Sequence, residues 1–388
     1  MKKYYWHSAV TSVIVLTGVF GLSNSTVEAQ GNSDIEQNSN GISQQRQLLA
    51  LNQNQDSFKL EIIKDFTNYV ILPTYEQLAV KAEQLSQTID NFVANPNLDT
   101  LKNAQNTWIE TRIPWEQGES FAFGPADSLG YDGDLDDWPV NEVDVQGVIS
   151  NKQKLTLNDI NNLQTTQKGF HTIELLLFGT NKNKQVQDFT PQELAYLQLL
   201  AQAFENTSQE LLNSWSKGVQ GYPPYKDILS TAGNLDNPAY PTIQAAFEEI
   251  AQGIIGCLDE VGNDKIGIPL EAQTTDELES RFSHTSLNDF KNNLISVKNA
   301  YLGTLSDNSH SESVQSLSLW VASQNPSLDK RVKSEIENAI ASLDAIPAPI
   351  ETNINNPKVL KQMEEAKKSV LQLFQTMEKD VLPLIQNS

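Results

Sequence analysis

The 388-residue sequence predicts an all-α protein made of two packed helical-bundle domains. Three observations predict this fold class. Apolar residues recur at helical spacing through most of the chain, the connections between these segments are short, and no alternating strand pattern of useful length is found. Residues 58–388 also exceed what one hydrophobic core usually organises, which favours two domains.

The first 57 residues are expected to lie outside both bundles. Lys2 and Lys3 precede an apolar run over residues 9–22, and small residues follow at the cleavage positions, so residues 1–29 predict a secretory signal peptide. No other segment approaches the roughly 18 to 20 apolar residues of a membrane span. Residues 30–57 are rich in Asn, Gln and Ser and predict a flexible linker.

The only cysteine, Cys257, lies far downstream of the predicted signal. A lipoprotein needs a cysteine directly after its signal peptide, so lipid anchoring through cysteine is not expected. An internal disulfide is also excluded, and stability must come from an ordinary core or from bound metal. We therefore expect an exported protein, periplasmic or otherwise extracytoplasmic, that is not a lipoprotein and has no transmembrane segment after signal removal.

The first bundle is predicted to span residues 58–225. Helical spacing runs through residues 58–92, with a kink expected at Pro73, and through residues 98–113, where Pro114 is expected to end the helix. Residues 115–140 combine many Gly and Pro residues with aromatic residues that include Trp115, Phe121, Phe123 and Trp138, which predicts a long ordered loop near the functional site. Further helices are expected over residues 141–150, 158–178 and 191–215.

The second bundle is predicted to span residues 226–388. Turn-forming residues across 218–240 indicate the connection between the domains. A glycine-rich turn is expected around residues 267–269. Helices are expected over residues 241–261, 288–302, 311–323, 327–345 and 356–384.

The chain is strongly acidic, with 27 Lys and Arg against 49 Asp and Glu and a net charge of -22. Such a charge repels phosphate backbones at neutral pH, so a nucleic-acid partner is not expected. An acidic surface is compatible with collecting cations. It is more simply a solvated exterior that keeps an exported protein in solution.

The most distinctive motif is Gly169-Phe170-His171-Thr172-Ile173-Glu174. His171 and Glu174 are three residues apart, so on a helix they share a face, as in the Glu-x-x-His pairs of metal-binding bundles. The flanking residues are apolar almost all round, which indicates a buried helix where a carboxylate needs a cation or a donor. Gly169 would let another backbone or a ligand approach closely. The alternative is a core histidine hydrogen-bonded to Glu174.

A second group of charged residues lies between Arg112 and Phe121. Iron or zinc takes about four to six donors, so Glu116 and Glu119 are expected to complete a site begun by His171. The alternative is a salt-bridged helix end. The acidic run over residues 132–137 begins like a calcium loop but lacks the glycine and glutamate that such a loop requires.

Four blocks in order resemble the imelysin-like family: residues 108–125, the Asp-Trp-Pro-Val run at 137–140, the motif at 169–174 and the Glu-Ser-Arg-Phe-Ser run at 279–283. The likeness covers residue 58 to the C-terminus. It implies an exported protein of two helical bundles, with the motif in the first bundle and a functional pocket near their interface. It also implies a role in bacterial iron uptake, with iron as the ligand and zinc or another divalent metal as the alternative.

The resemblance implies His171 and Glu174 as metal ligands, and direct roles for the other site residues are inferred from the charged and polar residues around them. Five are expected as metal ligands: His171, Glu174, Glu116, Glu119 and Asp137. Four more are expected at the pocket, where an arginine would fix a carboxylate or an anion: Arg112, Trp115, Arg281 and Ser283.

Three functions remain open on these residues. The first is an iron-binding protein that holds a metal ion or an iron chelate and passes it to a membrane iron permease. The second is a metal-dependent peptidase, as the family was first described, in which Glu116 or Glu119 acts as general base. The third is an adhesive or structural module in which the motif is only a core contact.

Overall fold

The structure is a computed structural model that describes residues 54–151, 154–305 and 314–388. The described residues form helices and turns without any strand, which confirms the all-α class. None of the described helices is long and apolar enough to cross a membrane. The predicted signal peptide and residues 30–53 of the predicted linker lie outside the described residues.

The first long helix is continuous from residue 54 to residue 94, with a π-helical turn in its middle. Residues 54–66 lead into η1 (Thr67–Ile71) and then α2 (Leu72–Ala94). This π-helical turn ends at Ile71, two residues before Pro73, which cannot donate a backbone hydrogen bond. Residues 54–57, predicted as linker, are helical because the helix that buries Ile62 and Phe66 extends past its first core residue.

The second helix, α3 (Leu98–Glu116), is capped by Asn97, whose side chain accepts from the backbone of Thr100. The expected end at Pro114 is wrong, because the helix continues to Glu116. A proline inside a helix removes one backbone hydrogen bond. Burial of Trp115 and the ion pair of Glu116 with Arg112 in the last turn offset that loss.

The segment expected as a long loop is folded into three short helices joined by turns. These are η2 (Glu119–Phe121), α4 (Pro125–Ser128) and α5 (Tyr131–Asp136). Gly124 and Gly130 precede α4 and α5 with φ of 63° and 75°, a region that L side chains rarely adopt. The segment is thus ordered, as predicted. It forms short helices where a loop was expected, because turns at Gly124 and Gly130 separate one helix from the next.

The helix expected over residues 158–178 is divided into α7 (Leu157–Asn161), η3 (Thr165–Gln167) and α8 (Gly169–Phe178). Gly169 starts α8 with φ of 77°, and a Cβ there would lie 2.5 Å from the carbonyl oxygen of Leu135. The predicted close approach of another backbone at this glycine is therefore confirmed, and it brings α5 against α8. The neighbouring helices are α6 (Glu142–Ser150), η4 (Val186–Asp188) and α9 (Pro191–Ser216).

The remaining helices follow a connection that includes α10 (Tyr225–Ser230). They are α11 (Ile243–Asp259), the π-helix η5 (Glu260–Lys265), α12 (Gly267–Ala272), α13 (Ser286–Leu302), α14 (Leu317–Gln324), α15 (Pro326–Asp344), α16 (Ile350–Asn353), α17 (Pro357–Thr376), η6 (Met377–Val381) and α18 (Leu382–Gln386). The helix expected over 356–384 is interrupted by η6, just before Pro383 in α18.

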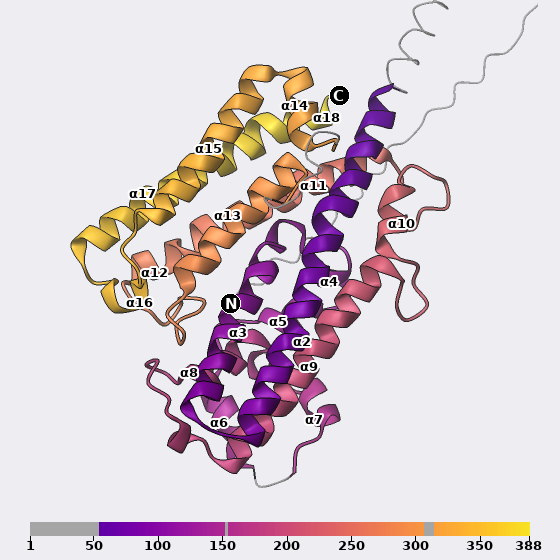
Figure 1. The fold of residues 1–388 in the computed structure, drawn as a ribbon. Coiled ribbons are helices and arrows are strands. Elements are labelled where there is room, and N and C mark those ends of the chain that lie inside the picture. Colours follow the sequence, from indigo (N-terminus) through magenta and orange to yellow (C-terminus); the bar gives the residue numbers. More distant parts are fainter. Residues whose placement is uncertain (1–53, 152–153, 306–313) are drawn as a thin grey trace, which may run out of the picture. The chain divides into compact units, whose positions relative to one another are not determined.

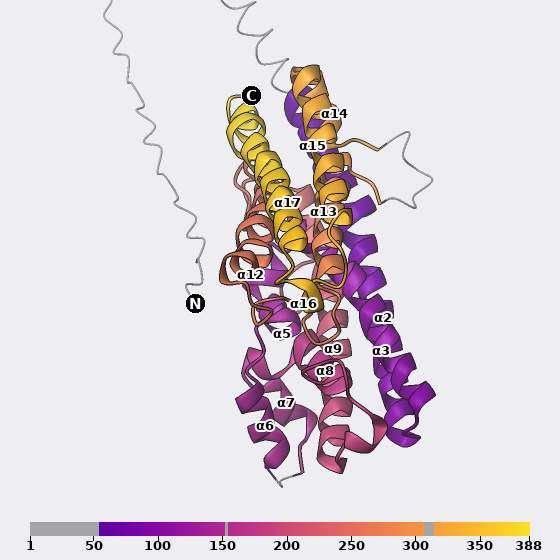
Figure 2. The ribbon, with the colours of Figure 1, turned by 90° about the vertical axis from the view of Figure 1, so that its left-hand side faces the viewer.

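The described helices pack in two groups within one compact unit, residues 53–388 (Figures 1 and 2). In the first group α2 packs on α3 and α9, and α8 also packs on α3 and α9. In the second group α15 packs on α13, α14 and α17, and α11 packs on α13 and α17. The groups meet where α13 contacts α3 and where α11 contacts η2. The assignment of these groups to separate domains, 58–225 and 226–388, stays a prediction.

Gly253 lies at a close contact between the groups. A Cβ at this position of α11 would lie 2.2 Å from the carbonyl oxygen of Ser120 in η2. Any larger side chain would push the two elements apart. The absence of a side chain at Gly253 thus lets η2, which follows α3, pack directly on α11 of the second group.

Candidate functional site

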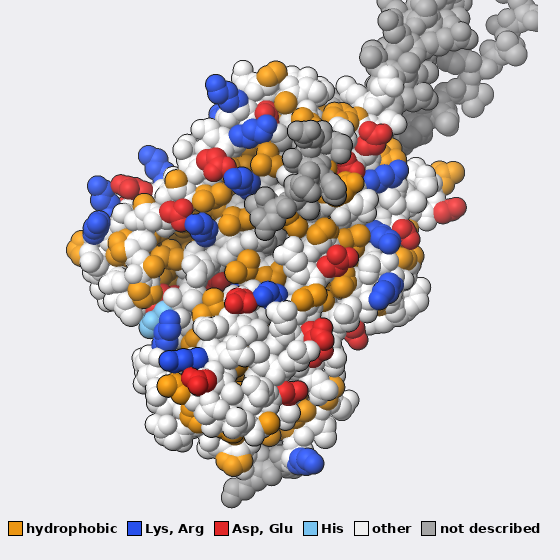
Figure 3. All heavy atoms as spheres, in the orientation of Figure 1, with side chains coloured by type: hydrophobic (Ala, Val, Ile, Leu, Met, Phe, Trp, Pro, Cys, Tyr) orange, Lys and Arg blue, Asp and Glu red, His pale blue; other side chains and the backbone are white. Residues whose placement is uncertain are grey.

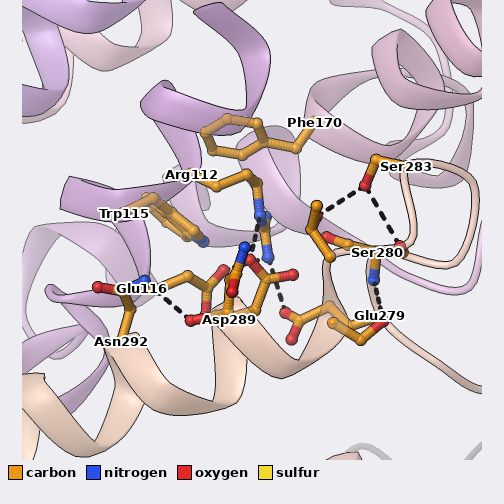
Figure 4. Close-up of polar contacts among 12 residues, drawn as sticks. Arg112, Trp115, Glu116, Phe170, Glu279, Ser280, Ser283, Asp289 and Asn292 are labelled. Carbon is orange, nitrogen blue, oxygen red and sulfur yellow. Dashed lines mark hydrogen bonds and ion pairs between the residues drawn. The ribbon is translucent and has the colours of Figure 1, made fainter. Parts of the chain in front are cut away.

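A buried charge cluster lies where the two helical groups meet (Figure 4). The first group contributes residues from α3, α5 and α8, and the second contributes residues from η5, α13 and the turn before α13. The cluster consists of five carboxylates, two permanent cations and one histidine: Glu116, Asp136, Glu174, Glu279, Asp289, Arg112, Lys265 and His171. The face drawn in Figure 3, by contrast, carries scattered charged side chains of both signs.

Arg112 lies at the centre of the cluster. Its guanidinium forms ion pairs with Glu116, one turn further along α3, and with Asp136. The same group lies 3.0 Å from Glu279 Oε1, 3.6 Å from Asp289 Oδ1 and 4.8 Å from the ring centroid of Phe170. Burial lowers the pKa of Arg112, but the surrounding carboxylates outweigh it and raise this pKa well above its usual value. Arg112 therefore stays charged.

Lys265 is a second buried cation and reaches the cluster from the end of η5. Its Nζ donates to Glu279 Oε1 at 3.0 Å and to Asn293 Oδ1 at 3.2 Å, and lies 3.5 Å from Glu116 Oε2. The amide of Asn293 donates in turn to Glu116 Oε2 at 2.6 Å. Burial opposes the charge, yet the carboxylates raise the pKa of Lys265 well above its usual value.

His171 lies on α8 between two carboxylates. Its Nδ1 is 3.1 Å from Glu174 Oε2, and the other oxygen of Glu174 accepts the backbone N–H of Ser283 at 2.7 Å. Both oxygens of Glu174 are thus engaged, so this carboxylate orients the imidazole. His171 Nε2 has no hydrogen-bond partner among the described residues, although Asp136 Oδ1 lies 3.1 Å away.

The pKa values of His171 and Asp136 are shifted in opposite directions. Burial opposes protonation of His171, but Asp136 and Glu174 outweigh burial and raise its pKa to about 9. Burial likewise opposes ionisation of Asp136, but Arg112 and His171 outweigh it and lower its pKa. Without metal, the pair is therefore an imidazolium beside a carboxylate.

The cluster holds more carboxylates than cations. Five carboxylates against Arg112 and Lys265 give -5 + 2 = -3, or -2 when His171 is protonated. Buried negative charge without a partner is unfavourable, so some carboxyl groups retain protons. Burial, with the charge of Glu116, raises the pKa of Glu279 to about 7 and raises that of Asp289 well above its usual value. A bound cation would take the place of these protons.

Two groups of side chains in the cluster have the geometry of a metal site. Donor atoms of Asp136, His171 and Glu279 lie within 4.8 Å of one another, and so do those of Glu116, Glu279 and Asp289. Carboxylates with an imidazole suit iron or zinc. His171 Nε2 and Glu279 Oε2 are buried without a hydrogen-bond partner among the described residues. The residues of the first group therefore fit a divalent cation.

Several residues expected from the sequence meet in the cluster. His171, Glu174, Glu116 and Arg112 are part of it. Trp115 Nε1 donates to Asp136 Oδ2 at 2.6 Å and so fixes that carboxylate. Ser283 takes part through its backbone N–H, while its hydroxyl lies 2.7 Å from Thr285 Oγ1.

Three expected residues have side chains that form no hydrogen bond or ion pair with the cluster. Asp137 accepts a hydrogen bond from Thr165. Arg281 pairs with Glu142 at 2.8 Å and keeps 18% of its side chain exposed. Glu119 is half-buried in η2, where burial and the charge of Glu260 raise its pKa well above its usual value.

Four cluster residues were not expected from the sequence, Asp136, Lys265, Glu279 and Asp289, and neither was Asn293, which donates to the cluster. For two of them the sequence contained a feature that could have indicated the residue. Glu279 begins the Glu-Ser-Arg-Phe-Ser run, and Asp136 is adjacent to the expected Asp137. No sequence signal identifies Lys265, Asp289 or Asn293, because tertiary packing brings them to α3.

Comparison with known proteins finds relatives over most of the chain. The family model described as imelysin matches residues 71–377. Iron-regulated protein A of Synechococcus elongatus is 35% identical over 337 residues, 87% of this chain and 90% of that protein. The crystal structure described as an iron-regulated protein A precursor from Parabacteroides distasonis is 26% identical, with a TM-score of 0.77, over 85% of this chain and 95% of its own. An imelysin-like protein from Psychrobacter arcticum shares the fold, with 14% identity and a TM-score of 0.66 over 85% and 96% of the two chains.

Proposed function

The chain belongs to the imelysin family and is an iron-related member of it, and we propose that it binds iron in the buried charge cluster and serves iron uptake outside the cytoplasm. One observation carries this proposal. His171, Asp136 and Glu279 place an imidazole and two carboxylates around one point, within a cluster whose negative charge exceeds its fixed positive charge. A divalent cation is the ligand that this arrangement suits.

In the proposed site the metal ligands are His171 Nε2, Asp136 and Glu279. Glu174 holds the Nδ1–H of His171, so that Nε2 carries the lone pair, and Trp115 holds the second oxygen of Asp136. Such outer partners fix a ligand's orientation and raise its affinity for metal. His171 gives up its Nε2 proton when iron binds. The assignment replaces Glu174, Glu116, Glu119 and Asp137 of the sequence-based ligand set with Asp136 and Glu279.

Burial of the cluster supports a bare ion as the ligand in preference to an organic chelate. Each of His171, Glu174 and Glu279 is at most 2% exposed, which leaves little surface for a bulky group. The predicted signal peptide, together with a relative described as a precursor, supports a location outside the cytoplasm. A membrane iron permease is the proposed recipient of the ion.

The contacts of Glu116 favour binding without catalysis. This carboxylate pairs with Arg112, lies 3.5 Å from Lys265 Nζ and accepts from Asn293. A general base must reach and accept a proton from water, and a carboxylate held by two cations is poorly suited to that role. We therefore do not propose peptidase activity.

Anaerobic titration of the metal-free protein with Fe(II) tests the proposal, with calorimetry for affinity and elemental analysis for stoichiometry. We expect one iron per chain in the wild type and none after His171→Ala combined with Asp136→Ala. Asp137→Ala is the matched control, since it removes the neighbouring carboxylate outside both ligand groups. Stoichiometric iron binding by the double variant would refute the site.

A further inference from the structure

The ligands of the proposed iron site are buried and come from both helical groups. His171 and Glu279 are at most 2% exposed, and the side chain of Asp136 is 6% exposed. His171 and Asp136 belong to α8 and α5 of the first group, whereas Glu279 lies in the turn before α13 of the second. An ion can therefore enter or leave only when the protein opens, and separation of the two groups would uncover all three ligands.

The first long helix has one end in each group (Figure 1). Near its start, Lys59 Nζ donates to Gln244 Oε1 of α11 at 2.6 Å, and Asp65 Oδ2 accepts the backbone N–H of Gln315 at 2.7 Å. Its later part, α2, packs on α3 and α9 of the first group. The other crossing in the described chain, residues 217–242, consists of turns and the short helix α10. The first long helix is therefore the stiffer of the two connections.

Several features weaken this helix where it passes from one group to the other. The π-helical turn η1 lies there, a geometry that is frequent at functional sites. Pro73, two residues after η1, has no backbone N–H to donate. Thr67 and Thr74 each donate a side-chain hydrogen bond of 2.8 Å to the carbonyl four residues earlier, which favours bending. Residues 67–74 are therefore the part of the helix where bending is favoured.

We propose that the two groups hinge about residues 67–74 to admit and release the ion, and that the bound ion holds the groups together. The inference rests on the proposed function for the position of the ion. Because its ligands lie on both sides, the ion binds the closed form and shifts the population toward that form. Opening also breaks the hydrogen bond of 2.7 Å between Ser283 and Glu174 and the ion pair of 2.8 Å between Arg281 and Glu142.

Buried charge pairs between the groups make the open form rare. Arg112 lies 3.0 Å from Glu279 Oε1, and Lys265 Nζ lies 3.5 Å from Glu116 Oε2, so opening separates opposite charges. Binding that requires a conformational change is slower than diffusional encounter. The rate of metal uptake should therefore level off at high ion concentration, at the rate of opening.

Replacement of Pro73 by alanine tests the hinge, with Zn(II) as the ion. Alanine adds a backbone donor and favours a helix interior, so full-length Pro73→Ala should fold. The added hydrogen bond must break when the helix bends. We expect zinc uptake and release, followed with a chromophoric chelator, to slow by the same factor, about 2- to 10-fold, which corresponds to the net contribution of one hydrogen bond. The dissociation constant should not change, because the closed form that binds zinc is the same.

Pro383→Ala is the matched control. The π-helical turn η6 ends at Val381, two residues before Pro383, so this proline follows a π-helical turn at the same distance as Pro73 does. Its helix, α18, packs on η6 and α11 within the second group. Its replacement should leave the rates of zinc uptake and release unchanged.

Distances between the groups test whether the ion holds them together. Spin labels are attached at two exposed helix positions, Gln202→Cys in α9 and Glu365→Cys in α17, with Cys257→Ala to remove the natural thiol. Double electron-electron resonance then measures the distance between the labels. We expect Zn(II), which is diamagnetic, to narrow the distance distribution of the metal-free protein, because it removes the open form.

Rates for Pro73→Ala that equal those of the wild type, or of Pro383→Ala, would overturn the inference. A distance distribution that bound Zn(II) leaves unchanged would do the same and would leave the proposed function standing. A wild type that binds neither Zn(II) nor Fe(II) would contradict the proposed function, and the inference with it.

Discussion

The backbone N–H of Ser283 donates a hydrogen bond of 2.7 Å to Glu174 Oε1, joining the turn before α13 to helix α8. The other oxygen of Glu174 lies 3.1 Å from His171 Nδ1. The second helical group thus fixes the ring of a histidine that belongs to the first. This chain of two contacts directs His171 Nε2 toward Asp136.

Replacing Glu174 by glutamine should weaken metal binding without removing a ligand. The amide keeps the size of the side chain but loses the charge that orients His171, and loss of such a partner typically costs about 10- to 100-fold in affinity. Calorimetric titration with Fe(II) measures the change. Ser283→Ala is the matched control and should bind as the wild type does, because the donor to Glu174 is the backbone N–H. Equal affinity of Glu174→Gln and wild type would contradict the orienting role.

Gly253→Ala should destabilise the protein, because a Cβ there would lie 2.2 Å from the carbonyl oxygen of Ser120. Shifting the backbone to relieve such a contact costs about 1–3 kcal/mol. Gly256 lies on the same helix with no atom within 4 Å of its Cβ position, so Gly256→Ala should instead stabilise by about 0.5–1 kcal/mol. Urea denaturation of both variants measures these differences. Equal effects of the two alanines would show that the close approach of α11 to η2 does not matter.

The metal-free protein should lose stability as the pH rises from 6 to 9. Burial, with the charge of Glu116, raises the pKa of Glu279 to about 7, and Asp136 and Glu174 outweigh burial to raise that of His171 to about 9. The folded state therefore holds these protons more tightly than the unfolded chain, where the pKa values are about 4.3 and 6.5. The contribution of His171 is complete below pH about 6.5 and is lost through pH about 9.

Urea denaturation in the presence of a chelator at pH 6, 7.5 and 9 checks this pH dependence. His171→Gln should lose less stability over the same pH range than the wild type does, because the variant lacks the imidazole whose deprotonation contributes to the loss. A wild type that is as stable at pH 9 as at pH 6 would contradict the charge assignment in the cluster.

Local patterns in the sequence predicted the helices and the central motif. His171 and Glu174 were placed correctly on a buried helix, because spacing within one helix decides which side chains share a face. Spacing within a helix could not show which of the adjacent residues Asp136 and Asp137 contacts His171. Helix α5 ends at Asp136 and Asp137 is extended, so the adjacent carboxylates point to different partners.

Tertiary contacts decided the features that local patterns missed. Pro114 is typical of a helix end, yet burial of Trp115 and the ion pair of Glu116 with Arg112 keep α3 helical to Glu116. Lys265 meets Glu116 across 149 positions of sequence, and Asn293 meets it across 177. A single sequence carries no signal for contacts of that range, so the cations and amides that complete the cluster emerge only from the fold.

The most direct test of the proposed iron site is a crystal structure of the iron-loaded protein with anomalous scattering measured at the iron edge. We expect one anomalous peak, within about 2.0–2.3 Å of His171 Nε2 and of carboxylate oxygens of Asp136 and Glu279. No peak in iron-loaded crystals, or a peak bound by Glu119 or Asp137 and distant from His171, would contradict it.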